Sequence, residues 1–457
     1  MTAVRVSKPV MSNSSAVLEE ETAARPETAS ILTGNHSRIE DSLPAWLVDQ
    51  QRAAWTQFQS LPMPARTDQA WRFSNLSALD LSRFHAAGPV CEQEGQEILE
   101  RSNGLDRNSG RLVFADDHLL QRDVVSDDLR KAGVIFQPLE RAMIEHEEVF
   151  RRHFMGRPAT LGSAKFAALH EAFVRSGIFL YVPRGIEIEL PLETFHWLHT
   201  ENVAIFPHTL VLAEEMSKVT LVENFRSTDR LRPGFACGVN DLIVGAGAKV
   251  TYVSAQDWSE NSLSIQINAT TVSRDAAAMN LHLALGGKYS RLESLSRLTG
   301  EGGRSDMLAV AVVQGMQEFD ARTLQDHASP HTASDLLFKN ALSDKARTIF
   351  GGLIRVEPHA HFTDAYQKVR NLLLSDDAEA NSMPGLEILA DNVRCTHGAT
   401  SGQLDEDEMF YLLARGIPAP VARQLLVGGF LNEVLERLPD RALIEKLEAL
   451  IAARFAR

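Results

Sequence analysis

The chain has 457 residues, of which 44% are hydrophobic and 23% charged, and its formal net charge at pH 7 is −14. This length exceeds one compact core and predicts two or three domains, or one elongated domain. The acidic balance argues against a nucleic-acid-binding protein, because such proteins need a basic surface to displace counterions. No apolar run approaches the ~20 residues of a membrane span, and residues 1–10 lack the apolar stretch of a secretory signal.

The cysteine pattern predicts the compartment. Cys91, Cys237 and Cys395 lie far apart and form no CxxC pair. This fits a reducing environment without disulfides and excludes a zinc site built from cysteines alone. We therefore expect a cytoplasmic protein.

The N-terminal third reads as a tail followed by helices. Residues 1–40 are rich in Ser, Thr, Ala and Glu and show no apolar period, which predicts a disordered tail. Residues 41–160 form a mixed, mainly helical region, in which 112–115 and 134–136 are short buried strands and 140–154 is helical.

Residues 161–402 change character, because short apolar runs alternate with Gly, Asp, Asn and Pro turns. A corner of small residues followed by a strand recurs at 217–219, 248–250 and 277–279, with spacings of 31 and 29 residues. A fixed period of this size indicates stacked repeats, and the units leave no room for a crossover helix. The prediction is a mainly β protein with a parallel β-helix core whose coils each hold two or three short strands, rather than a β-sandwich.

Residues 403–457 are predicted to form three helices. Asp405 is a plausible N-cap with Glu408 three residues later, and Arg415 with Gly416 closes this first helix. The second and third helices span about 418–438 and 441–455. Their apolar faces either pack together and onto the β region, or one of them docks a partner, and both alternatives stay open.

Motifs of self-contained enzymes are missing from the sequence. Residues 286–289 read Gly-Gly-Lys-Tyr and lack the Ser or Thr and the earlier glycine of a P-loop. No GxGxxG, GxSxG or HExxH motif occurs, which argues against a hydrolase or a dehydrogenase. A carbohydrate-active β-helix enzyme would need carboxylates clustered on one strand face, and the predicted strands show none.

Two pairs of residues could bind a ligand. Cys395 and His397 are two residues apart, so they share a face if they lie on a strand, and a thiolate with an imidazole suits iron or a transferred sulfur. The alternative is a buried Cys that acts as a small apolar residue beside a hydrogen-bonded His. His359 and His361 would also share a strand face, but no carboxylate or Cys at useful spacing supports them. The polar patch 326–335, with His327, is expected to be a set of turns.

Many ordered motifs resemble the SufB/SufD family of the Suf iron–sulfur cluster assembly machinery. The resemblance is strongest over about 320–435 and extends more weakly to 71–76 and the β repeat. It implies a right-handed parallel β-helix between helical terminal regions. It also implies that SufB and SufD pair through their β-helices and that each docks a SufC ATPase on its C-terminal helices. The matching segments are 327–339, 350–354, 366–367, 371–375, 386–388, 395–400, 410–412 and 415–417.

Two departures point to the SufD branch of the family rather than to SufB. SufB-like chains carry a sulfur-accepting Cys just before the Leu run and His-Glu-Ala-Thr later, whereas 367–371 here contains no Cys and Gly398 follows His397. The resemblance then implies a non-enzymatic scaffold subunit of a SufB–SufC–SufD complex, without a tightly bound cofactor. The alternatives are a structural adaptor without ligands, or the sister SufB subunit.

The resemblance also assigns roles to residues. His397, with Cys395, would hold iron or a transient cluster shared with a SufB-like partner, and His397 would be the metal ligand. The ATPase-docking residues would be Phe410, Tyr411, Arg415 and Phe430. A homodimer is the expected alternative assembly of the chain alone, and neither nucleic acid nor a membrane is an expected partner.

Overall fold

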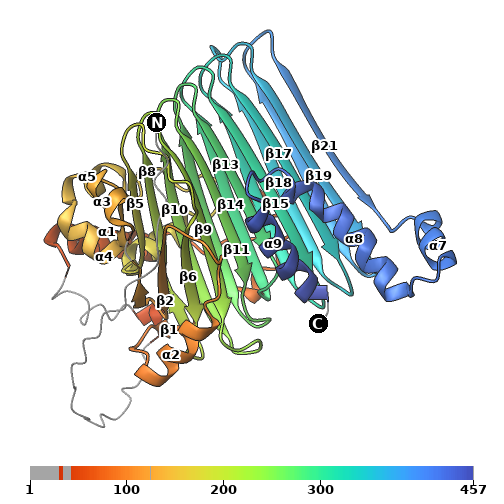
Figure 1. Cartoon of the computed structure of the whole chain (residues 1–457), viewed down its shortest axis with the longest axis horizontal. Helices are drawn as coiled ribbons and strands as arrows, with labels where there is room; N and C mark the ends of the chain where they lie inside the picture. The colour runs from red at the N-terminus through yellow and green to blue at the C-terminus, as the bar shows by residue number, and fades with distance from the viewer. Residues whose placement is uncertain (1–29, 34–42, 124, 456–457) are drawn as a thin grey trace.

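Two long, mainly parallel β-sheets face each other along the protein (Figure 1). The computed structural model describes residues 30–33, 43–123 and 125–455. Sheet A has 11 strands and sheet B has ten, and from β9 (Lys218–Ser227) onward the chain alternates between them. Each coil therefore contributes one strand to each sheet. The expected parallel β-helix core, flanked by helical regions, is confirmed.

The strands of the two sheets are as follows in chain order. Sheet A contains β1 His85–Ala86, β4 Ile135–Pro138, β5 Gly177–Val182, β7 Val203–Ile205, β8 His208–Ala213, β10 Gly234–Val244, β12 Leu263–Val272, β14 Tyr289–Leu298, β16 Glu318–His327, β18 Arg347–Val356 and β20 Glu379–Ile388. Sheet B contains β2 Gly110–Ala115, β3 His118–Arg122, β6 Leu192–Leu198, β9 Lys218–Ser227, β11 Lys249–Asp257, β13 Ala277–Ala284, β15 Arg304–Val313, β17 Ala333–Leu342, β19 Asp364–Leu373 and β21 Arg394–Gly402.

The sequence repeat corresponds to the length of one coil. Lys218 pairs with Lys249, 31 residues later, and Lys249 pairs with Ala277, 28 residues later. The sequence pattern gives the right period but places its third unit one residue too late, because small residues occupy 276, 277 and 278 alike. From β9 onward a coil holds two strands of 8 to 11 residues, longer than the short strands expected.

Left-handed residues turn the chain at the corner where each strand of sheet A leads into sheet B. The corners of successive coils bond to one another: the backbone N–H of His331 donates to the carbonyl of His361 (2.9 Å), and that of Phe362 donates to Asn392 (3.1 Å). These stacked corners hold the strands in register. The residues with positive φ at this corner are Gly185, Met216, Gly247, Asp275, Gly302, His331, Phe362 and Asn392.

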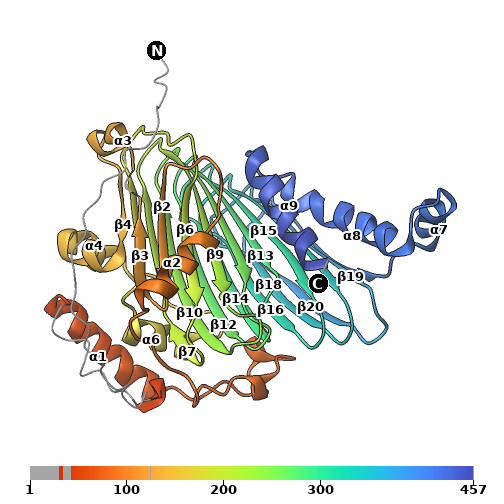
Figure 2. The same ribbon diagram turned by 60° about the horizontal axis from the view of Figure 1, so that its bottom comes forward.

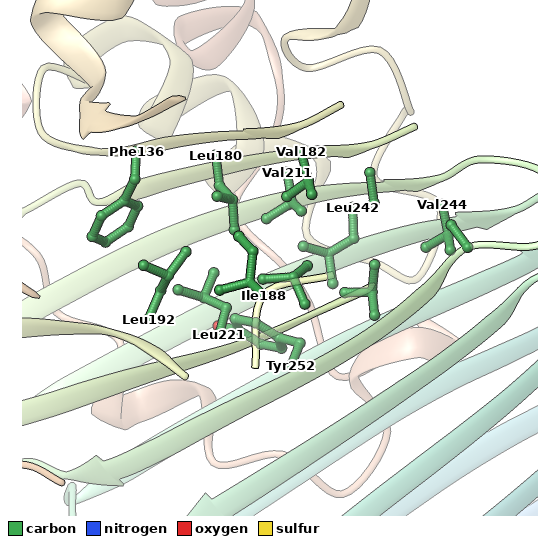
Figure 3. Close-up of a cluster of buried hydrophobic side chains, with 14 of the residues drawn as sticks. Phe136, Leu180, Val182, Ile188, Leu192, Val211, Leu221, Leu242, Val244 and Tyr252 are labelled. Carbon is green, nitrogen blue, oxygen red and sulfur yellow. The ribbon is translucent and has the colours of Figure 1, made fainter. Parts of the chain in front are cut away.

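Apolar side chains fill the space between the sheets at the N-terminal end of the β-helix. Figure 3 shows these side chains pointing toward one another from strands of both sheets. Alternation along each strand produces this layer, because every second side chain points inward. Members of the cluster are Phe136, Leu180, Val182, Ile188, Leu192, Val211, Leu221, Leu242, Val244 and Tyr252.

Strands from the N-terminal third close this end of the β-helix. β2 pairs in parallel with β6 and antiparallel with β3, while β4 pairs antiparallel with β5. The strands expected at 112–115 and 134–136 are confirmed, but they extend both sheets. These strands therefore belong to the same two sheets as the β-helix.

The helices α1 to α6 lie on the outside of the same end (Figure 2), whereas the segment with η2 and η3 contacts β14 and β16 farther along the β-helix. The segment expected to be helical at 140–154 is divided at His146 into α4 (Leu139–Glu145) and α5 (Glu147–His153). α6 was not expected from the sequence, and its Phe166 and Leu169 are buried in a cluster that also contains Phe235 of sheet A. The helices are η1 Ile31–Thr33, α1 Ala45–Ser60, η2 Gln69–Trp71, η3 Leu76–Ala78, α2 Glu92–Arg101, α3 Asp127–Lys131, α4 Leu139–Glu145, α5 Glu147–His153 and α6 Ala164–Phe173.

The tail expected at 1–40 lies largely outside the described residues. The described part departs from that expectation, because Ile31 is buried and its N–H donates to the carbonyl of Phe84 (2.9 Å).

Three C-terminal helices follow β21: α7 Glu406–Ala414, α8 Ala419–Leu435 and α9 Arg441–Phe455. Their number and approximate bounds agree with the sequence. Asp405 caps α7 by accepting from the N–H groups of Asp407 and Glu408 (2.9 and 3.0 Å). α8 and α9 share a buried apolar cluster with the outer face of sheet B, whereas α7 has no buried residue and stands clear of the sheets (Figure 2).

Candidate functional site

The C-terminal end of the β-helix is open. β20 is the last strand of sheet A and β21 the last strand of sheet B, and they are ten and nine residues long. At the opposite end the edge strands β3 and β4 are only five and four residues long. Long unpaired edges present rows of free backbone N–H and C=O groups and favour strand addition.

Cys395 and His397 both lie on the inward-facing side of β21. They pair in register with Ala365 and Gln367 of β19, whose side chains are completely buried between the sheets. Side chains in neighbouring parallel strands point the same way at paired positions, so β21 presents the two residues toward the same interior. The described chain adds no further coil over them, and His397 is therefore exposed.

Cys395 is half-buried in an apolar setting. It packs against a small cluster that contains Ile354, Val356 and Ala365. Burial, with the nearby Asp364 carboxylate as a second cause, raises the pKa of its thiol. The thiol form is therefore favoured over the thiolate, which agrees with the alternative of Cys395 as a small apolar residue.

The other histidines singled out in the sequence lie elsewhere. His359 and His361 occupy the turn between β18 and β19, so the prediction that they share a strand face is wrong. A ring nitrogen of His361 lies 3.1 Å from the Asp391 carbonyl. His327 ends β16 inside the β-helix, where hydroxyls of Thr332 and Ser334 each lie 2.8 Å from its ring, and burial lowers its pKa to about 4.

No complete metal site was found within the described part of the chain. Over residues 30–33, 43–123 and 125–455, no group of three or more His, Cys, Asp and Glu side chains is arranged to hold a metal ion. A metal ion bound by His397 therefore needs further ligands that the described part of this chain does not supply.

The residues expected to dock an ATPase fall into two groups. Phe410 and Tyr411 of α7 are 71% and 56% exposed, and the Arg415 guanidinium lies 4.5 Å from the centre of the Tyr411 ring. Phe430 instead packs toward sheet B, with the Lys339 ammonium 4.4 Å from its ring centre. Phe430 thus helps to attach α8 to the β-helix.

The exposed apolar side chains of α7 and α8 include residues that were not predicted to dock an ATPase. We define the α7–α8 surface as Phe410, Tyr411, Leu413, Val421 and Leu425, all of which are exposed. Val421 and Leu425 read in the sequence as ordinary apolar positions of a helix. The sequence could not indicate which side of α8 faces away from sheet B.

Family models match almost the whole described chain. The SufBD core domain of the SUF system for FeS cluster assembly matches residues 196–430, and the SufBD N-terminal region matches residues 27–194. The chain belongs to the SufB/SufD family. Its open β-helix end and its three C-terminal helices are therefore features of a SufB/SufD-family protein involved in iron–sulfur cluster assembly.

Relatives of both branches cover the chain nearly end to end. The iron–sulfur cluster assembly protein SufD of Bacillus subtilis is 29% identical over 89% of this chain and 94% of its own length. An iron–sulfur cluster assembly SufBD family protein of Synechocystis is 29% identical over 96% of both chains. SufB of Bacillus subtilis is 24% identical over 90% of this chain and 89% of its own length.

None of the helices in the described ranges combines the length and the apolar character needed to cross a bilayer.

Proposed function

We propose that this chain is the SufD-type scaffold subunit of a cytoplasmic SufB–SufC–SufD complex that assembles nascent iron–sulfur clusters, and that it is not itself an enzyme. The open C-terminal end of the β-helix, with His397 on its inner face, carries the proposal. An unpaired end of this size is completed when the β-helix end of a SufB-like subunit packs against it. The higher identity to a SufD than to a SufB of the same organism supports the SufD role.

In this proposal iron and the nascent cluster are cargo, shared between two chains. His397 supplies an imidazole nitrogen, a common iron ligand, from one side of the seam. The principal sulfur-accepting thiol comes from the SufB-like partner, because 367–371 contains no Cys. Cys395 lies beside the seam as a secondary thiol.

A SufC-like ATPase would supply nucleotide hydrolysis, since the chain lacks a P-loop of its own. The α7–α8 surface is the proposed docking site. Its aromatic and aliphatic side chains, with Arg415 beside them, have the composition of an interface core.

The test is His397→Ala in the host cell, with His359→Ala as the matched control, because His359 is an exposed histidine on a nearby turn. We expect both variants to assemble with the SufB-like and ATPase subunits in a pull-down, and only His397→Ala to reduce cluster delivery in iron-poor medium. Normal delivery by His397→Ala would favour an adaptor without ligands. A pull-down that recovers only this chain would favour the homodimer.

A further inference from the structure

Gln367 lies in the interior with an unsatisfied amide. It is 0% exposed, and neither its Nε2 nor its Oε1 has a hydrogen-bond partner. Among the described residues, Gln367 is the one side chain with two such buried polar atoms. A buried amide of this kind costs stability, so its presence calls for a state in which it is paired.

The surroundings leave space for this amide. Gly352 of β18 lies opposite, and a Cβ atom there would fall 2.1 Å from the Gln367 Nε2. The glycine therefore lets the long polar side chain extend across the interior, where an alanine would exclude it. A packing role alone would be better filled by Met or Leu, which need no partner.

The register places Gln367 between one apolar neighbour and one polar neighbour. On the inner face of sheet B its paired positions are Leu336 on β17 and His397 on β21. Leu336 offers no hydrogen bond. Adjacent strands are separated by about 4.8 Å, so the His397 ring is within reach of the Gln367 amide.

We propose that Gln367 is the positioning residue of His397. This inference rests on the proposed function. When a partner covers the open end, the Gln367 Oε1 accepts the N–H of one His397 ring nitrogen. A neutral imidazole has one N–H and one lone pair, so this bond fixes the tautomer and directs the other nitrogen to iron.

The test measures Fe(II) binding by the purified complex under anaerobic conditions. Gln367→Met keeps the size of the side chain but removes its acceptor, whereas Gln367→Glu keeps an acceptor. We expect Gln367→Met to weaken Fe(II) binding by roughly 10- to 100-fold, as losses of such supporting hydrogen bonds do. Gln367→Glu should retain the affinity, and the melting temperature of Gln367→Met should stay the same or rise.

Two comparisons exclude a merely structural role. The double variant of Gln367→Met with His397→Ala should bind Fe(II) no more weakly than His397→Ala alone, because the amide acts through the ring. The control is Asn371→Leu, since Asn371 lies on the same face of β19 but its amide is bonded to Ser401 (3.2 Å). This variant should lower the melting temperature and leave the Fe(II) affinity near that of the wild type.

Three results would overturn the inference in distinguishable ways. If His397→Ala itself leaves Fe(II) binding unchanged, the proposed function fails together with the inference. If His397→Ala weakens binding and Gln367→Met does not, only the role of Gln367 is refuted. Additive losses in the double variant would show that the amide acts independently of the ring.

Discussion

Replacement of Arg291 by alanine should release the N-terminal segment 70–75 from sheet A. Arg291 is fully buried on β14, and its Nη1 donates to Asp320 (2.6 Å) while its Nη2 donates to Glu293 (2.7 Å). The Nη2 also donates to the carbonyl of Ala70 (3.0 Å), and the guanidinium lies 3.7 Å from the centre of the Trp71 ring. Burial alone would lower the pKa of Arg291, but the two carboxylates hold it above its ordinary range.

The size of the effect follows from the burial of the partners. Removing Arg291 leaves the buried Glu293 carboxylate without the cation beside it, whereas the buried Asp320 carboxylate keeps its ion pair with Arg322 (2.7 Å). Breaking a buried ion pair on one side costs about 3–5 kcal/mol. If the free energy of opening segment 70–75 decreases by about 3 kcal/mol, the population of the open segment increases roughly 150-fold.

Limited trypsin digestion measures that population. Arg72 is an exposed trypsin site whose carbonyl accepts from Arg322 Nη2 (2.9 Å) in the closed segment. When opening and closing are fast relative to cleavage, the cleavage rate follows the open population. We expect Arg291→Ala to accelerate cleavage after Arg72 by at least ~100-fold.

The matched control is Arg230→Ala. Arg230 pairs with Glu260 at the surface, both side chains being about half exposed. Such a pair contributes about 0–1 kcal/mol, so cleavage after Arg72 should change less than roughly fivefold. A change below fivefold in Arg291→Ala as well would refute the idea that the buried charges hold this segment.

Two further predictions concern single positions. Because the pKa of the Cys395 thiol is raised, its alkylation by iodoacetamide should rise with pH later than that of free cysteine, as followed by mass spectrometry; an earlier rise would contradict the burial argument. Gly177→Ala would place a Cβ 1.9 Å from the His208 carbonyl oxygen at a φ of +126°, so it should destabilise the fold by about 2–4 kcal/mol in chemical denaturation. Gly428→Ala, in a helix with open space around it, should instead be neutral or stabilising by up to ~1 kcal/mol, and equal losses in both would refute the steric reason.

Local patterns of the sequence determined the elements of this protein. The period of about 30 residues gave the coil, and alternation along each strand gave the inward faces. Asp405 and Gly416 marked the ends of α7, because a cap needs only residues within one turn of its helix. The shared face of Cys395 and His397 followed from the same alternation. These features depend on neighbours a few residues away, which the sequence displays directly.

Tertiary structure decided everything that depends on distant neighbours. Strands β2 and β4 joined the two sheets through partners outside their own segment, and α6 formed where a strand region was expected. The side of α8 that packs against sheet B carries Phe430, and only the packed structure shows which side that is. His359 and His361 lie on a turn rather than on a strand.

The open end shows the same division. That β21 is a strand follows from its residues, but that β21 is the last strand follows from where pairing stops. The exposure of His397 results from that missing neighbour. A sequence records which side chains alternate, whereas only the assembled sheets determine which edge is left without a partner.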